Sequence, residues 1–107
     1  MTSAKKPLGN IKVLDLTHML SGPYGGMILA DFGCDVIKIE PPIKGEGTRR
    51  LLENDPNYSV NGMGAYFYTL NRNKKSVAID LKKDEGLKIF YKLVEKADVV
   101  LSNFSAG

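Results

Sequence analysis

Few side chains in this sequence belong to the types that usually catalyse reactions. The chain contains one histidine, His18, and one cysteine, Cys34. His18 follows an apolar run, where its ring can hydrogen-bond nearby backbone or contact a ligand, but no carboxylate or nucleophile stands at a spacing that would make it a catalytic base. Cys34 follows a glycine that ends a helical pattern, and a small packing residue is expected there. With no metal-ligand spacing and no Ser-His-Asp arrangement, these residue types indicate a binding location and do not specify a reaction.

Basic residues offer groups that could hold an anion. Two basic clusters are either solvated surface charge or groups that attract phosphate; they are Arg49-Arg50 and Arg72 with Lys74 and Lys75. Lys82 differs from both clusters, because it directly follows a predicted strand. Its ammonium group is therefore a candidate phosphate contact.

Glu40 ends a predicted strand, at the position where dinucleotide-binding folds place an acidic residue that holds a ribose hydroxyl. The turn that precedes the first helix lacks the Gly-x-Gly-x-x-Gly fingerprint of those folds. Nicotinamide or flavin binding is therefore the disfavoured alternative.

Two strand–helix–strand units would position these residues. The first has a strand, a helix and a strand over residues 11–16, 21–33 and 35–40, with Pro23 at the first helical position because its missing N–H needs no partner there. The second has a strand over residues 76–81, a helix with Asp84 as its N-cap, and a strand over residues 98–101. Between the units, residues 43–64 predict a long surface loop and residues 65–70 a short helix.

The first predicted helix contains two adjacent glycines. Tyr24, Met27 and Ile28 are expected on one apolar face. Gly25 and Gly26 each cost about 1 kcal/mol relative to alanine inside a helix. Either close packing of the helix against the sheet or close approach of a ligand would explain them, and both explanations stay open.

Repeated strand–helix–strand units predict an α/β fold with a mostly parallel sheet and right-handed crossovers. The carboxyl ends of parallel strands meet at one edge, where open α/β sheets bind ligands. That edge would collect Thr17, His18, Glu40, Pro41, Lys82, Asn103 and Phe104. The chain stops just after the fourth predicted strand, so we expect a sheet that is incomplete at its C-terminus.

Composition restricts the class of protein. The 107 residues suffice for one domain, and a net charge of +3 is too small to predict nucleic-acid binding. A lone cysteine excludes an internal disulfide and is compatible with a reducing compartment. Residues 1–7 are polar and expected to be flexible, and no signal peptide or membrane span is recognisable. These features predict a cytoplasmic protein that binds no membrane.

Four blocks of the sequence resemble the class III coenzyme A transferases, the family of formyl-CoA transferase, carnitine CoA-transferase and α-methylacyl-CoA racemase. They begin with Val-Leu-Asp-Leu-Thr-His…Ser-Gly-Pro and Leu-Ala-Asp-Phe-Gly-Cys-Asp-Val-Ile-Lys-Ile-Glu-Pro-Pro, and continue with Leu-Asn-Arg-Asn-Lys-Lys-Ser-Val-Ala-Ile-Asp-Leu-Lys and Ala-Asp-Val-Val-Leu-Ser-Asn-Phe. The resemblance covers residues 8–107 and corresponds to the N-terminal part of a longer family enzyme. It implies a Rossmann-like half domain that binds CoA.

The resemblance also implies an activity. Family members transfer CoA between carboxylic acids through acyl–aspartyl and aspartyl–CoA intermediates, with acyl-CoA as a substrate and no permanently bound cofactor. The nucleophilic aspartate lies beyond the matched stretch, so no catalytic residue is assigned and residues 1–107 alone are expected to be inactive. The partners implied are an acyl-CoA, a carboxylic acid and a second copy in an interlocked homodimer.

CoA contacts carry over from the family to seven positions: His18, Leu20, Ser21, Ile79, Lys82, Asn103 and Phe104. Leu20 stands where formyl-CoA transferase has a glutamine, which argues against oxalate or formate as substrates. The racemase branch usually lacks the Thr-His turn and the Asn-Arg-Asn-Lys-Lys block, which favours a transferase. The alternatives are a non-catalytic CoA- or nucleotide-binding module, an acyl-CoA racemase fragment and, less favoured, a nicotinamide-dependent oxidoreductase domain.

Overall fold

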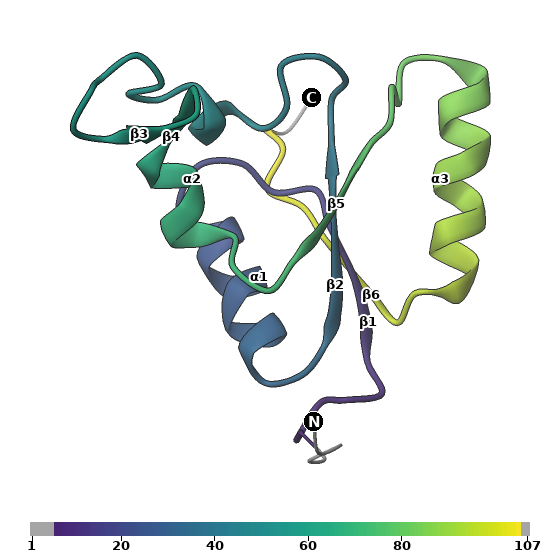
Figure 1. Ribbon diagram of the computed structural model, residues 1–107. Coiled ribbons are helices and arrows are strands. Elements are labelled where there is room, and N and C mark those ends of the chain that lie inside the picture. Colours follow the sequence, from purple (N-terminus) through teal and green to yellow (C-terminus); the bar gives the residue numbers. More distant parts are fainter. Residues whose placement is uncertain (1–5, 106–107) are drawn as a thin grey trace.

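The computed structural model of this chain describes residues 6–105, and its centre is a parallel sheet (Figure 1). The four strands of that sheet lie in the order β5-β2-β1-β6 and comprise Lys75–Ala78, Asp35–Glu40, Lys12–Asp15 and Val99–Leu101. All three pairings are parallel. This arrangement confirms the predicted α/β fold. From β1 the chain builds the sheet in one direction through β2 and β5, and then returns to place β6 on the other side of β1. The strand order therefore reverses between β1 and β6.

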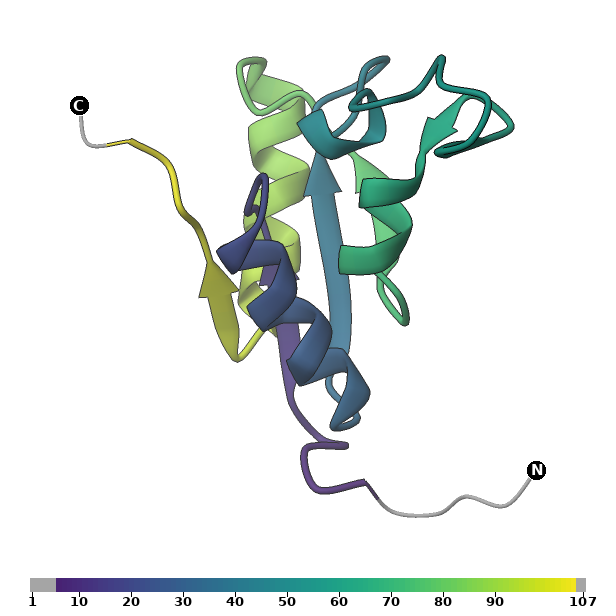
Figure 2. The same ribbon diagram turned by 90° about the vertical axis from the view of Figure 1, so that its left-hand side faces the viewer.

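Helices cover the two faces of the sheet separately. Figures 1 and 2 show α1 (Ser21–Asp31) and α2 (Ala65–Leu70) on one face and α3 (Asp84–Lys96) on the other. Successive strand residues point to opposite faces. Under α1, Val13 and Val36 pack with Ala30 and Cys34. Cys34 is thus the packing residue that the sequence predicts, and burial raises the pKa of its thiol.

The second apolar cluster lies between the sheet and α3. Leu14, Leu16, Ile39 and Ile79 are buried there, and α3 packs against them with an apolar stripe. That stripe includes Phe90, Leu93, Val94 and Ala97, which are only half-buried. The cluster continues to the carboxyl ends of the strands, where it becomes the floor of a pocket.

The buried face of α1 differs from the prediction. Tyr24 and Ile28 are 51% and 37% exposed, and Met27 alone of the predicted three is buried. The face that meets the sheet contains Pro23, Gly26, Met27 and Ala30. These positions repeat every three or four residues, so a residue one step away lies about 100° around the helix, outside the contact. The helix begins at Ser21, so Pro23 is its third residue and not its first.

The segment 43–64 contains more structure than the predicted loop. It holds a short 3-10 helix, η1 (Gly47–Arg49), and a hairpin of β3 (Ser59–Val60) and β4 (Met63–Gly64). Asn61 and Gly62 form the hairpin turn with φ values of 52° and 78°. Asn-Gly is the favoured pair for a turn with two left-handed residues, and this dipeptide is the signal that could have predicted the hairpin.

Several element boundaries also shift. The strand predicted over residues 76–81 begins at Lys75 and ends at Ala78, so Ile79 to Leu81 already form the loop beyond it. Lys83 is the N-cap of α3, and Asp84 is the first helical residue instead of the cap. Acidic side chains in a first turn interact favourably with the helix dipole. The flexible segment predicted over residues 1–7 lies mostly outside the described residues. Over residues 6–105, every helix is too short or too polar to cross a membrane.

Candidate functional site

A pocket opens at the carboxyl-terminal edge of the parallel strands. Its volume is about 340 Å3, and the loops that follow all four strands contribute to it. The lining residues are Leu16, His18, Ile39, Glu40, Pro41, Pro42, Ile79, Asp80, Leu81, Lys82 and Phe104. Open α/β sheets bind ligands at this edge. The pocket therefore occupies the position that the strand pattern of the sequence predicts.

Four of the seven predicted site residues line this pocket: His18, Ile79, Lys82 and Phe104. The other three, Leu20, Ser21 and Asn103, do not line it. Leu20 is the exposed N-cap residue of α1, and Ser21 is the first residue of that helix. Both residues are exposed to solvent and neither is part of the pocket lining.

The pocket combines an apolar floor with a cation at its rim. Leu16, Ile39 and Ile79 belong to the buried cluster under α3 and form the floor. The rings of His18 and Phe104 lie 6.3 Å apart at an angle of 44° and contribute one wall. Lys82 is exposed, and its backbone N–H donates to Asp80 Oδ1 at 3.0 Å. Such a pocket suits an amphiphilic molecule that carries negative charge.

The turn from Thr17 to Leu20, which we call the His18 turn, is fastened at its base by buried charges. Asp15 Oδ1 accepts hydrogen bonds from the Thr17 N–H, at 2.9 Å, and from the Thr17 hydroxyl. Lys38 Nζ donates to the Thr17 carbonyl oxygen at 2.9 Å and lies 3.3 Å from Glu46 Oε1. Because buried charges without partners are costly, these contacts hold the base of the turn firmly.

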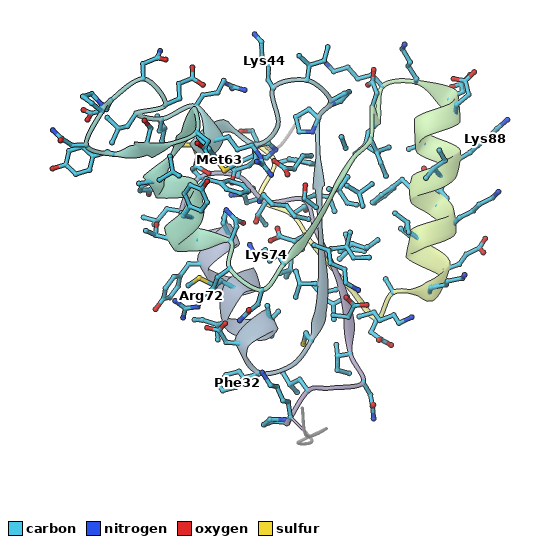
Figure 3. The ribbon with its side chains drawn as sticks, viewed as in Figure 1. Phe32, Lys44, Met63, Arg72, Lys74 and Lys88 are labelled. Carbon is cyan, nitrogen blue, oxygen red and sulfur yellow. The ribbon has the colours of Figure 1, made fainter. Side chains whose placement is uncertain are left out.

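Lys74, directly before β5, completes the buried arrangement (Figure 3). Its Nζ donates to Asp15 Oδ2 at 2.7 Å, Asn71 Oδ1 at 2.7 Å and the Pro23 carbonyl oxygen at 2.9 Å. Burial lowers the pKa of Lys74, and the contact with Asp15 opposes that shift only in part. Lys74 is therefore a structural cation, and it is not available to a phosphate group.

Glu40 is similarly occupied. Its carboxylate receives two hydrogen bonds from Arg49, at 2.7 and 2.8 Å, together with bonds from the Ser76 hydroxyl and the Glu46 N–H. Burial would raise the pKa of Glu40, but these hydrogen bonds lower it to about 2. Arg49 also stacks over the ring of Phe67, 3.9 Å from its centroid. Glu40 therefore does not have a free carboxylate with which to hold a ribose hydroxyl.

Most residues of the two basic clusters pair with carboxylates instead of attracting phosphate. Besides Arg49 and Lys74, Arg72 lies 2.7 Å from Asp31 and Lys75 lies 3.1 Å from Asp35. Local sequence patterns do not reveal this network, because most of its partners are far apart in the chain. A charged residue inside an apolar strand pattern, such as Lys38 between Ile37 and Ile39, is the signal that could have revealed it.

Comparison with known proteins identifies the family. The profile described as CoA-transferase family III matches residues 8–107. The chain is 45% identical over 104 residues to the succinyl-CoA:mesaconate CoA-transferase of Haloarcula hispanica, covering 94% of this chain and 25% of that protein. It is 41% identical over 108 residues to the succinate–glutarate CoA-transferase of Agrobacterium fabrum, covering 97% of this chain and 26% of that protein.

A solved structure agrees in fold. The crystal structure of a CAIB/BAIF family protein from Brucella suis matches with a TM-score of 0.83 at 41% identity, over 92% of this chain and 26% of that chain. The chain thus spans about a quarter of the length of the proteins that it matches. Since the family profile covers nearly all of its residues, this chain belongs to CoA-transferase family III.

Proposed function

We propose that this chain supplies the CoA-binding part of an enzyme that transfers CoA between carboxylic acids. The proposal is carried by the pocket at the carboxyl edge of the sheet, whose lining includes His18, Ile79, Lys82 and Phe104. CoA has a long, weakly polar pantetheine arm and a strongly anionic phosphate end. The apolar floor suits the arm, and Lys82 at the rim suits a phosphate.

The chemistry of transfer requires a nucleophilic carboxylate. Its oxygen attacks the donor thioester, the carbon–sulfur bond breaks and CoA leaves as a thiolate. The thiolate then attacks the aspartyl carbonyl carbon of the mixed anhydride, which forms an aspartyl–CoA thioester and releases the donor acid. The acceptor carboxylate next attacks that thioester and expels the thiolate, which takes the acceptor acyl group and restores the free carboxylate. Two carboxylates line the pocket, Glu40 and Asp80. Glu40 is held by several hydrogen bonds and Asp80 accepts the Lys82 N–H, while the resemblance places the nucleophilic aspartate beyond the matched stretch. We therefore assign the nucleophile to an aspartate outside this chain, on a longer polypeptide that we call the complete polypeptide.

The names of the relatives indicate which carboxylic acids to test as substrates. The names of both curated relatives contain succinyl-CoA or succinate, so succinyl-CoA is the donor to test first. An acyl-CoA racemase is the alternative within the same family, and it would exchange a proton beside the thioester without moving CoA to another acid. The interlocked homodimer implied by the sequence resemblance belongs to this proposal as well.

Calorimetric titration of the complete polypeptide with CoA, 3′-dephospho-CoA and NAD tests the binding proposal. CoA should bind more tightly than 3′-dephospho-CoA, because Lys82 would lose its phosphate partner, and NAD should bind least. Tighter binding of NAD than of CoA would overturn the assignment. Transfer of CoA from succinyl-CoA to other carboxylic acids, followed by chromatography, then distinguishes a transferase from a racemase.

A further inference from the structure

The His18 turn is fixed at its two ends and is less constrained between them. Thr17 is 2% exposed and is held by Asp15 and Lys38, and at the other end the Leu20 carbonyl oxygen accepts the Tyr24 N–H at 2.9 Å. The side chains of Met19 and Leu20 are not packed, because these residues are 50% and 56% exposed. Met19 also adopts a left-handed backbone conformation, with a φ of 74°. Burial therefore does not determine where the His18 ring lies at the pocket wall.

Asn103, in the segment that follows β6, holds the backbone of His18 in place. Its Oδ1 accepts a hydrogen bond from the His18 N–H at 3.0 Å, and its Nδ2 donates to the His18 carbonyl oxygen at 2.8 Å. The two residues are 85 positions apart in the sequence. The carboxamide thus links the segment after β6 to the turn after β1, where the ligand pocket lies.

The residue after Asn103 shows which side chain of this segment faces the pocket. Phe104 lines the cavity and lies against the His18 ring, whereas Asn103 is absent from the lining. One acceptor and one donor of the Asn103 carboxamide are already used on backbone groups. We infer that Asn103 is a positioning residue that acts on CoA through His18 and makes no CoA contact of its own. This inference rests on the proposed function for its ligand, and it departs from the role that the resemblance implies for Asn103.

The first test needs no ligand. In the complete polypeptide with 13C-labelled histidine, the His18 ring resonance is identified by its disappearance in a His18→Ala variant. Asn103→Ala should shift that resonance and broaden it, because the turn would sample other conformations. Asn103→Asp keeps the acceptor for the His18 N–H and loses the donor, so its shift should be smaller. Ser102→Ala, at the neighbouring exposed position, is the matched control and should change nothing. An unchanged resonance in Asn103→Ala would overturn the inference.

A double-mutant cycle on CoA affinity provides the second test. Asn103→Ala should weaken CoA binding about fivefold to tenfold when His18 is present, the range expected for lost hydrogen bonds. In the His18→Ala background the same change should cost less than about twofold. Equal losses in both backgrounds would mean that Asn103 contacts CoA directly, which contradicts the inference. If the unmutated protein binds no CoA, the proposed function fails, and the histidine spectrum alone then decides whether Asn103 positions His18.

Discussion

Lys82 lines the pocket and, among the described residues, forms no ion pair with a carboxylate, unlike Arg49 and Lys74. Arg49 and Lys74 each form an ion pair with a side chain that is at least 97% buried, Glu40 and Asp15 respectively. Lys82 projects from the pocket rim instead. An ammonium group without an ion-pair partner can bind a phosphate. Its place in the pocket lining together with its lack of a partner, and not its residue type alone, therefore makes Lys82 the candidate phosphate contact.

Lys82→Ala is expected to weaken CoA binding by about 1.5–3 kcal/mol, the usual contribution of a hydrogen bond to a charged group. Affinity for 3′-dephospho-CoA should change much less, because that ligand lacks the proposed phosphate partner. Lys88→Ala is the matched control, since Lys88 is exposed on α3 and points away from the sheet (Figure 3). Calorimetric titration measures the affinities of both variants and of the unmutated protein for CoA and for 3′-dephospho-CoA. Equal CoA affinity in Lys82→Ala and the unmutated protein would return Lys82 to ordinary surface charge.

Glu40 is expected to make the protein sensitive to acid. Its pKa falls from the model-peptide value of 4.5 to about 2 in the fold, so the folded state holds the ionised carboxylate more strongly than the unfolded state. The resulting stabilisation is complete above pH 4.5 and disappears as the pH falls towards 2. It amounts to at most about 3.5 kcal/mol, given roughly 1.4 kcal/mol per pKa unit.

Thermal unfolding between pH 6 and 2.5 measures this effect. In Glu40→Gln the part of the pH dependence below pH 4.5 should flatten, although the variant should unfold at a lower temperature near neutral pH because Arg49 loses its partner. Glu95→Gln, on the exposed face of α3, is the control and should keep the original pH profile. An unchanged profile in Glu40→Gln would show that Glu40 is not responsible.

At the scale of elements, α1 depends on a glycine that lets it approach β1. A Cβ atom on Gly26 would lie 2.6 Å from Asp15 Oδ2 and 3.2 Å from Lys74 Nζ, which form the buried ion pair. The same atom on Gly25 would meet nothing within 4 Å. Close packing therefore explains Gly26 and does not explain Gly25, so the two glycines that the sequence presents as one feature have separate causes.

Alanine substitutions separate those causes. Gly26→Ala should destabilise the fold by about 1–3 kcal/mol, because the added methyl group displaces the ion pair. Gly25→Ala should stabilise the fold by up to about 1 kcal/mol, the difference in helix propensity. Thermal unfolding of both variants gives the two signs. If Gly25→Ala binds CoA more weakly but unfolds at a higher temperature, close approach of the ligand would be the reason for Gly25. If Gly25→Ala unfolds at a lower temperature, the result would contradict the open space that the structure shows around Gly25.

The sequence predicts where helices and strands lie better than it predicts which face of each element is buried. The bounds Asp35–Glu40 and Ala65–Leu70 agree with the predicted strand and short helix. Strand and helix types follow from local periodicity and from nearby glycine and proline residues. Which stripe of α1 is buried depends on the sheet beneath it, and the local pattern misplaced Tyr24 and Ile28 for that reason.

At the scale of the whole molecule, much apolar surface stays exposed in the described chain. Val77, Val99 and Val100 on the outer strands are 37%, 37% and 47% exposed. No residue of α3 is buried, although its stripe packs against the sheet. Strands of a parallel sheet usually have both faces covered. The described residues therefore bury less apolar surface than such a sheet normally does.

Residues 1–107 expressed alone are accordingly expected to unfold with low cooperativity and to transfer no CoA. The first expectation follows from the exposed strand surface, and the second follows from the nucleophilic aspartate that we place outside this chain. Calorimetry with size-exclusion chromatography tests the first, and an assay for CoA transfer from succinyl-CoA tests the second. A sharp, reversible transition from a monodisperse monomer would contradict the stability expectation, and transfer by this chain would contradict the placement of the nucleophile elsewhere.

Periodicity and turn residues over short stretches of the chain are enough to predict the α/β class, the parallel sheet and the edge at which the pocket lies. Which charged groups are free depends instead on the three-dimensional fold. Lys74 meets Asp15 across 59 positions, and Asn103 meets His18 across 85. Contacts of that range arise when the sheet brings distant strand ends together, and no local pattern encodes them. The protonation and availability of each group follow from those long-range contacts, so they could not be predicted before the fold was known.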